Sequence, residues 1–132
     1  MLQLGFDPGR DKCGLAILDT TGNIIVHEVV NSEQAVFTIK NWCHVYAIDQ
    51  IVMGNQTTSK TWQDTLKANF PEIPITMVDE RNSTLEARER YWQLYPPRGL
   101  WRLVPKGMRI PPRPIDDIVA VLLVERACQS EG

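Results

Sequence analysis

The chain has 132 residues, a length that fits one domain around one hydrophobic core. Its composition, 43% hydrophobic and 23% charged, is typical of a soluble globular protein and argues against disorder. A net charge of −2 provides no overall attraction to nucleic acid, and no segment has the apolar length of a membrane span or the features of a signal peptide. We therefore expect a single cytoplasmic domain over residues 1–132 that does not contact membranes.

The first half of the chain predicts a small antiparallel sheet followed by a helix. Residues 2–7, 13–19 and 24–30 have the character of strands, and the turn residues Gly22 and Asn23 predict a hairpin between the second and third strands. Residues 32–46 carry apolar side chains at helical spacing, with Ser32 as the expected N-cap.

The second half predicts strands that alternate with helices. Strands are expected at 50–54 and 73–78 and a helix between them at 59–70, which requires parallel pairing through a crossover. A further helix at 83–94 opens with the capping-box spacing of Ser83 and Glu86. Residues 115–128, apolar from 118 to 124, predict a buried last helix. The fold class is therefore α/β, with a mixed five-stranded sheet flanked by helices.

The three cysteines favour reduced thiols. Cys13, Cys43 and Cys128 are odd in number, widely spaced and next to apolar residues. This pattern is more typical of core thiols than of a disulfide framework or a zinc site. The two histidines, His27 and His44, do not stand at metal-ligand spacing from them.

Acidic residues occur at three distant places that the predicted topology brings to one edge of the sheet: Asp7, Asp79–Glu80 and Asp116–Asp117. Ligands of such sheets bind at the carboxyl ends of the parallel strands. A cluster of carboxylates suits a hard cation such as Mg²⁺ or Mn²⁺, which prefers oxygen ligands, and without a cation the cluster would repel itself.

Each of these carboxylates also has a purely structural explanation. Asp7 can shape the turn that follows it. Asp79 can cap the turn after the fifth strand, or Glu80 can pair with Arg81 in solvent. Asp116 or Asp117 can cap the last helix and interact favourably with its dipole.

An irregular excursion at about 95–114 is rich in proline and basic residues. No acidic residue occurs from Arg90 to Ile115. The prolines exclude a continuous helix, and long irregular segments in compact domains are often functional. Aromatic residues between arginines can stack on unpaired bases while the cations neutralise phosphates, although the apolar residues here could equally pack into the core or a second protomer. The nucleic-acid-binding candidates in this excursion are Arg98, Trp101, Arg102, Lys106, Arg109 and Arg113.

Four segments in order, GFDPGRDKCGLAILD, IVMG, ITMVDERNSTLEARER and IDDIVAVLLVE, resemble the signature segments of the YqgF family, also called RuvX. Its members are RNase H-like proteins described as Holliday-junction-resolvase-like and as nucleases of precursor 16S rRNA. The resemblance implies an RNase H-like fold with sheet order 3-2-1-4-5, three antiparallel strands followed by two parallel ones. The run VDERNSTLEAR carries the most specific part of it.

The resemblance also implies a nuclease site that holds two Mg²⁺ or Mn²⁺ ions. It assigns catalysis to Asp7, Glu80 and Asp116, with Asp79 and Asp117 as further metal candidates. In such a site one ion activates the attacking water and the other stabilises the leaving 3′ oxygen. The substrate implied is structured RNA or branched DNA, and cutting a junction at two symmetric positions calls for a two-fold homodimer. Arg10, Lys12 and Arg81 are placed to meet backbone phosphates, although a role in surface solubility explains them almost as well.

Departures from the family pattern leave two other functions open. Arg10 and Asp11 replace the usual threonine and basic residue, and Gly54-Asn55-Gln56-Thr57-Thr58 replaces the usual G-L-P-x-N loop. A nucleic-acid-binding protein whose nuclease activity has decayed is therefore the main alternative. An actin-like phosphotransferase, suggested only by Asp7-Pro8-Gly9, would need a second nucleotide-binding half that 132 residues cannot contain.

Overall fold

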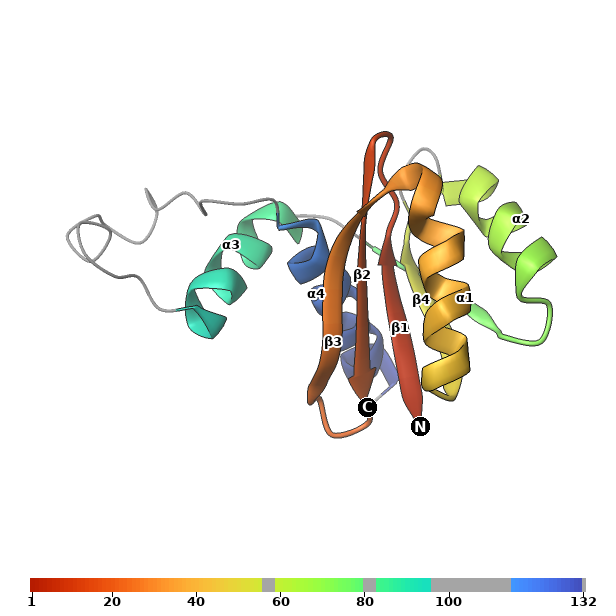
Figure 1. Cartoon of the computed structure of the whole chain (residues 1–132). Helices are drawn as coiled ribbons and strands as arrows, with labels where there is room; N and C mark the ends of the chain where they lie inside the picture. Colours follow the sequence, from red (N-terminus) through yellow and green to blue (C-terminus); the bar gives the residue numbers. More distant parts are fainter. Residues whose placement is uncertain (56–58, 80–82, 96–114, 132) are drawn as a thin grey trace.

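The protein is a five-stranded sheet with helices on both faces (Figure 1). The computed structural model describes residues 1–55, 59–79, 83–95 and 115–131, with residues 83–85 and 128–131 described by their backbone only. The elements in chain order are β1 (Leu2–Asp7), β2 (Lys12–Asp19), β3 (Ile24–Asn31), a 3₁₀ turn η1 (Ser32–Gln34), α1 (Ala35–Val45), β4 (Ile48–Gly54), α2 (Ser59–Asn69), β5 (Ile75–Val78), α3 (Ser83–Leu94) and α4 (Asp116–Glu131).

The sheet has the order β3-β2-β1-β4-β5. β1 pairs with β2, and β2 with β3, in antiparallel fashion, whereas β1–β4 and β4–β5 are parallel. The predicted fold class and strand order are therefore confirmed. Since β1, β4 and β5 run in the same direction, their carboxyl ends lie at one end of the sheet, where Asp7 ends β1 and Asp79 follows β5.

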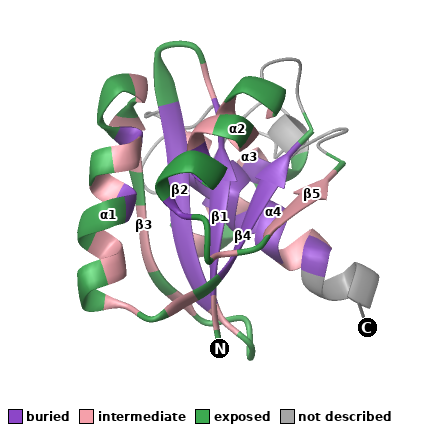
Figure 2. Ribbon diagram, turned by 90° about the vertical axis from the view of Figure 1, so that its right-hand side faces the viewer, coloured by how far each residue is buried: buried purple, intermediate pink, exposed green. Residues whose placement is uncertain are grey.

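Alternating side chains give the sheet an apolar layer on each face. Leu4 and Phe6 of β1 pack with α1 and α2, in a cluster that includes Ile39 and Leu66. The opposite face is covered by α4, which is buried at every position from 117 to 124. Figure 2 shows the central strands buried between these layers, while much of α1 faces solvent. The continuous burial explains why the sequence of α4 lacks a polar stripe.

Helix α4 lies directly against the backbone of β1 and β2 because two glycines face it. A Cβ atom at Gly5 would lie 2.2 Å from the carbonyl oxygen of Ala120, and one at Gly14 would lie 1.8 Å from that of Asp116. Neither distance is compatible with a side chain. These two glycines therefore fix how closely the helix approaches the sheet, and at which register.

The start of α1 differs from the prediction that Ser32 is its N-cap. The 3₁₀ turn η1 precedes the helix, and the N-cap position falls on Gln34, which makes no side-chain capping hydrogen bond. The hydroxyl of Ser32 instead donates to the carbonyl oxygen of Gly9 at 2.9 Å. This prediction was wrong because the turn between β1 and β2 competes for the same hydroxyl.

Some predicted features fall partly or wholly outside the residues that the structure describes. Helix α3 begins at Ser83 as expected, but the side chain of Ser83 in the proposed capping box lies outside the description. The excursion also lies outside the described residues from 96 to 114.

Cys13 and Cys43 are free thiols, as predicted, and the side chain of Cys128 is not described. Among the described residues, no helix has the length and apolar character to cross a membrane.

The close approach of α4 predicts that Gly5→Ala destabilises the protein. The added methyl group would meet the helix backbone rather than a flexible side chain, so α4 must shift. We expect a loss of about 1–3 kcal/mol in the free energy of unfolding, typical of overpacking, measured by urea denaturation. Gly22→Ala is a control whose added atom meets nothing within 4 Å and whose cost arises from its positive φ of 90°. An unchanged stability in Gly5→Ala would contradict the proposed seating of α4.

Candidate active site

Asp7 lies at the last position of β1, on the face of the sheet that α4 covers. Side chains alternate along a strand, so Asp7 shares this face with Gly5, whereas Phe6 points to the other face. The side chain is 7% exposed. The turn after it is tight, since a Cβ atom at Gly9 would lie 2.0 Å from the carbonyl oxygen of Lys12. Strand and turn together hold the carboxylate at the end of the sheet.

Asp116, the first residue of α4, lies beside Asp7. In the β1–β2 ladder Asp7 is directly opposite Gly14, and Gly14 touches the backbone carbonyl of Asp116. Burial raises the pKa of the Cys13 thiol, hydrogen bonding to Gly9 and Ser32 lowers it, and the nearby charges of Asp7 and Asp116 raise it further. Both carboxylates therefore lie near one point, although 109 positions separate them in the sequence.

The environment of Asp116 holds the pKa of its carboxyl group above the ordinary value. Partial burial raises the pKa of its carboxyl group, the neighbouring charge of Asp117 raises it further, and Lys12 lowers it. A bound cation would act in the same direction as Lys12, because an opposite charge stabilises the ionised carboxylate. The site is thus electrostatically suited to a positive ligand.

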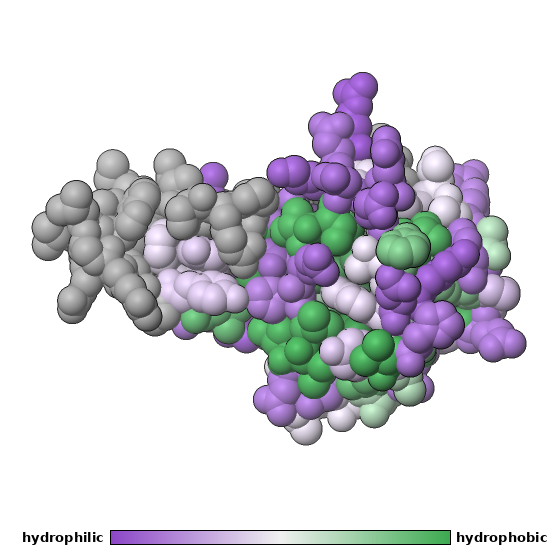
Figure 3. Space-filling model, in the orientation of Figure 1, coloured by the Kyte–Doolittle hydropathy of each residue, from purple (hydrophilic) through white to green (hydrophobic). Residues whose placement is uncertain are grey.

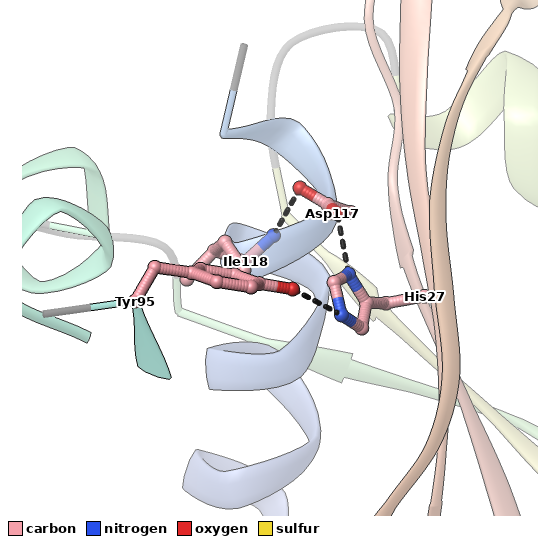
Figure 4. A network of polar contacts seen from close by, with 4 residues as sticks. All are labelled: His27, Tyr95, Asp117 and Ile118. Atoms are coloured by element: carbon pink, nitrogen blue, oxygen red, sulfur yellow. Dashed lines mark hydrogen bonds and ion pairs between the residues drawn. The ribbon is translucent and has the colours of Figure 1, made fainter. Parts of the chain in front are cut away.

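Asp117, the second residue of α4, is 2% exposed and engages both carboxylate oxygens within the protein. Oδ2 lies 2.6 Å from Nδ1 of His27 on β3, and Oδ1 accepts the backbone N–H of Ile118 at 2.9 Å. The other ring nitrogen of His27, Nε2, lies 3.2 Å from the hydroxyl of Tyr95, directly after α3 (Figure 4).

His27 is a residue that the sequence reasoning missed. Its spacing in the sequence speaks only against a metal site shared with the cysteines. The predicted hairpin could have indicated which face His27 occupies. His27 pairs with Ala16 in the β2–β3 register and therefore lies on the same face of the sheet as Gly14, which faces α4. The identity of its partner, 90 positions away, has no local signature.

Asp79 follows β5 and is exposed. Its backbone carbonyl accepts a hydrogen bond from Arg126 of α4 at 2.7 Å, and Arg126 also pairs with Glu86 of α3 at 2.8 Å. Arg126 is ten residues beyond Asp116, about 15 Å along the helix. The structure thus joins the end of β5 to the second half of α4. Glu80, the remaining acidic candidate, lies outside the described residues.

Two of the predicted basic residues are described, and both are exposed. Arg10 lies in the turn between β1 and β2, and Lys12 begins β2. Figure 3 shows hydrophilic side chains projecting from this end of the molecule. The other basic and aromatic candidates fall outside the described residues: Arg81, Arg98, Trp101, Arg102, Lys106, Arg109 and Arg113.

The donor set at Asp7 and Asp116 fits a hard divalent cation. Within the described parts of the chain, no group of three or more His, Cys, Asp or Glu side chains is arranged to hold a metal ion. Mg²⁺ commonly uses only one or two protein carboxylates, and waters and substrate phosphates complete its shell. Two carboxylates at the same end of the sheet, with oxygen donors alone, suit this requirement.

Two solved structures share this fold over nearly the whole chain. The first is Thermus thermophilus RuvC in complex with a Holliday junction substrate, with a TM-score of 0.64, 15% identity, and coverage of 99% of this chain and 95% of that one. The second is a further Thermus thermophilus RuvC structure, with a TM-score of 0.64, 14% identity, and coverage of 99% and 96%. At this identity the likeness establishes the fold alone. No curated protein matches the sequence significantly.

A family model provides the more specific comparison. The model of RuvX, described as Holliday junction resolvase, matches residues 1–98. This range contains Asp7, Asp79 and the whole sheet, whereas α4 and its two aspartates lie beyond it. The match covers well over half of the chain, and the fold agrees with it. The chain therefore belongs to the RuvX family of Holliday-junction-resolvase-like nucleases.

Proposed function

We propose that this protein is a metal-dependent endonuclease that hydrolyses phosphodiester bonds in structured nucleic acid, either four-way DNA junctions or precursor 16S rRNA. The observation that carries the proposal is the position of Asp7 and Asp116 on one face of the sheet, at the carboxyl end of β1. Membership of the resolvase family supports the reaction class. The RuvC complex shows this fold with a Holliday junction in another protein.

Asp7 and Asp116 would hold Mg²⁺ or Mn²⁺, with Glu80 proposed as a third ligand. When bound, such an ion lowers the pKa of a coordinated water and offsets charge that develops on the phosphate. Asp7 is held in place by β1 and its turn, and Asp116 by the contact of α4 with Gly14. The two carboxylates are therefore positioned before any ligand binds, which favours catalysis.

Arg10 and Lys12 would contact the phosphate backbone next to the metal site. Both are exposed at the end of the sheet where Asp7 lies, and Lys12 is close enough to Asp116 to lower the pKa of that carboxyl group. The basic residues at 81 and 98–113 are proposed to extend this contact. We further propose that the protein acts in the cytoplasm and that junction cleavage uses a homodimer.

A panel of substrates tests the reaction and separates the two nucleic acids. Purified protein is incubated with a four-way DNA junction, precursor 16S rRNA or single-stranded controls, with Mg²⁺, Mn²⁺ or EDTA. We expect cleavage of one structured substrate that requires the cation, and sedimentation velocity on the same sample reports the oligomeric state. Salt-dependent binding without cleavage of any substrate would instead support a protein whose nuclease activity has decayed.

Substitution Asp7→Asn is expected to abolish metal-dependent cleavage while the fold is retained. The amide has the same shape as the carboxylate but lacks the charge that a hard cation requires. Cleavage rates are compared with the wild type, and circular dichroism checks the fold. Asp11→Asn, which removes a negative charge from the exposed part of the same turn, is the matched control and should remain active. Undiminished cleavage by Asp7→Asn would exclude the assignment.

Substitution Lys12→Ala is expected to weaken binding of nucleic acid by removing one phosphate contact. The slope of log affinity against log salt concentration should become less steep by about one. Fluorescence anisotropy with a labelled junction, measured in Ca²⁺ or EDTA over a salt series, provides this slope. Lys40→Ala is the control, since Lys40 is exposed on α1, which packs on the opposite face of the sheet. Equal slopes for both variants would contradict this role of Lys12.

A further inference from the structure

Helix α4 begins with two consecutive aspartates, Asp116 and Asp117, whose carboxylates have different partners. We propose that His27 is a positioning residue that fastens Asp117 to β3 and so leaves Asp116 as the metal ligand at the start of α4. This inference rests on the proposed metal-dependent function and identifies which of the two aspartates serves it.

The helix itself separates the two side chains. Consecutive residues of an α-helix are about 100° apart around the axis. Asp117 points to His27 on β3 (Figure 4), whereas the backbone of Asp116 touches Gly14 and its carboxylate is near Lys12, which begins β2. Asp117 therefore contacts β3, whereas Asp116 lies against β2 at Gly14, the residue that pairs with Asp7.

Burial explains why Asp117 requires His27. A carboxylate that is 2% exposed is costly unless hydrogen bonds or an opposite charge compensate for lost hydration. His27 occupies Oδ2 and the N–H of Ile118 occupies Oδ1, so both oxygens already have protein partners. Metal coordination by Asp117 would have to displace at least one of these contacts.

His27 is itself held from two sides. Nδ1 faces Asp117 and Nε2 faces the hydroxyl of Tyr95, with the two ring centroids 6.4 Å apart. The side chain is largely shielded, at 22% exposed. Partners on both ring nitrogens fix the orientation of an imidazole, as they do for residues that support metal ligands. The first turn of α4 is therefore tied to β3 and to the end of α3.

Binding of Mn²⁺ to the full-length chain without nucleic acid distinguishes the two aspartates, with isothermal titration calorimetry as the readout. We expect Asp116→Asn to weaken Mn²⁺ affinity at least about tenfold. Asp117→Asn should change it by no more than about threefold, because the amide still offers His27 a hydrogen-bond partner. His27→Ala should weaken affinity by about tenfold, the lower end of the effect of removing a supporting residue.

Two further variants separate positioning from general loss of structure. His27→Asn retains a hydrogen-bonding group near Asp117 and should recover part of the lost affinity. Glu28→Gln, an exposed neighbour on β3 that faces away from α4, is the matched control and should bind Mn²⁺ as the wild type does. Hydrogen exchange of the amides at 118–120 should accelerate in His27→Ala and remain unchanged in Glu28→Gln.

The outcomes distinguish this inference from the proposed function. Equal losses of Mn²⁺ affinity in Asp117→Asn and Asp116→Asn would overturn the inference while leaving the nuclease proposal intact. Unaltered affinity and amide exchange in His27→Ala would also overturn it. Mn²⁺ binding with the expected pattern but no cleavage of nucleic acid would overturn only the proposed function. A wild-type chain that binds no Mn²⁺ would overturn both.

Discussion

The contact between helix α4 and the bare backbone of β1 and β2 determines the geometry of the candidate site. Because Gly5 and Gly14 carry no side chains, the helix rests on the backbone of the strands themselves. This seating places the first residue of α4 next to the last residue of β1. A larger residue at either glycine would separate the two carboxylates on which the proposed chemistry depends.

The same contact of α4 with the sheet brings the carboxylates of Asp7, Asp116 and Asp117 to one end of the sheet, where Asp116 and Asp117 have different partners. The carboxylate of Asp117 is bound by His27 and by a backbone N–H, while the charge of Lys12 lowers the pKa of Asp116. Burial and the charge of Asp117 raise the pKa of Asp116 and so disfavour its ionised form, which a bound cation would favour. Sites that store such unfavourable interactions commonly exchange stability for function.

Local patterns in the sequence predicted the strands and the buried character of α4, because short apolar runs between turn residues mark strands and a longer continuous apolar run marks a buried helix. The strand order was implied by the family resemblance. The convergence of Asp7 with Asp116 also followed from topology. The capping role of Ser32 was wrong because a distant carbonyl, that of Gly9, binds its hydroxyl. The pairing of His27 with Asp117 could not be predicted, since it joins residues 90 positions apart through tertiary packing alone. The roles of Glu80 and of the excursion remain predictions.

The contacts of His27 with Tyr95 and Asp117 also affect how the length of the connection between α3 and α4 can change. Tyr95 and Asp117 contact the same imidazole, so the side chains at the end of α3 and at the start of α4 meet at His27. For a segment whose ends are already joined, doubling its length costs only about 0.6 kcal/mol of loop-closure entropy. The contacts at His27 hold the two ends of this connection, so a change in its length would cost the fold little loop-closure entropy.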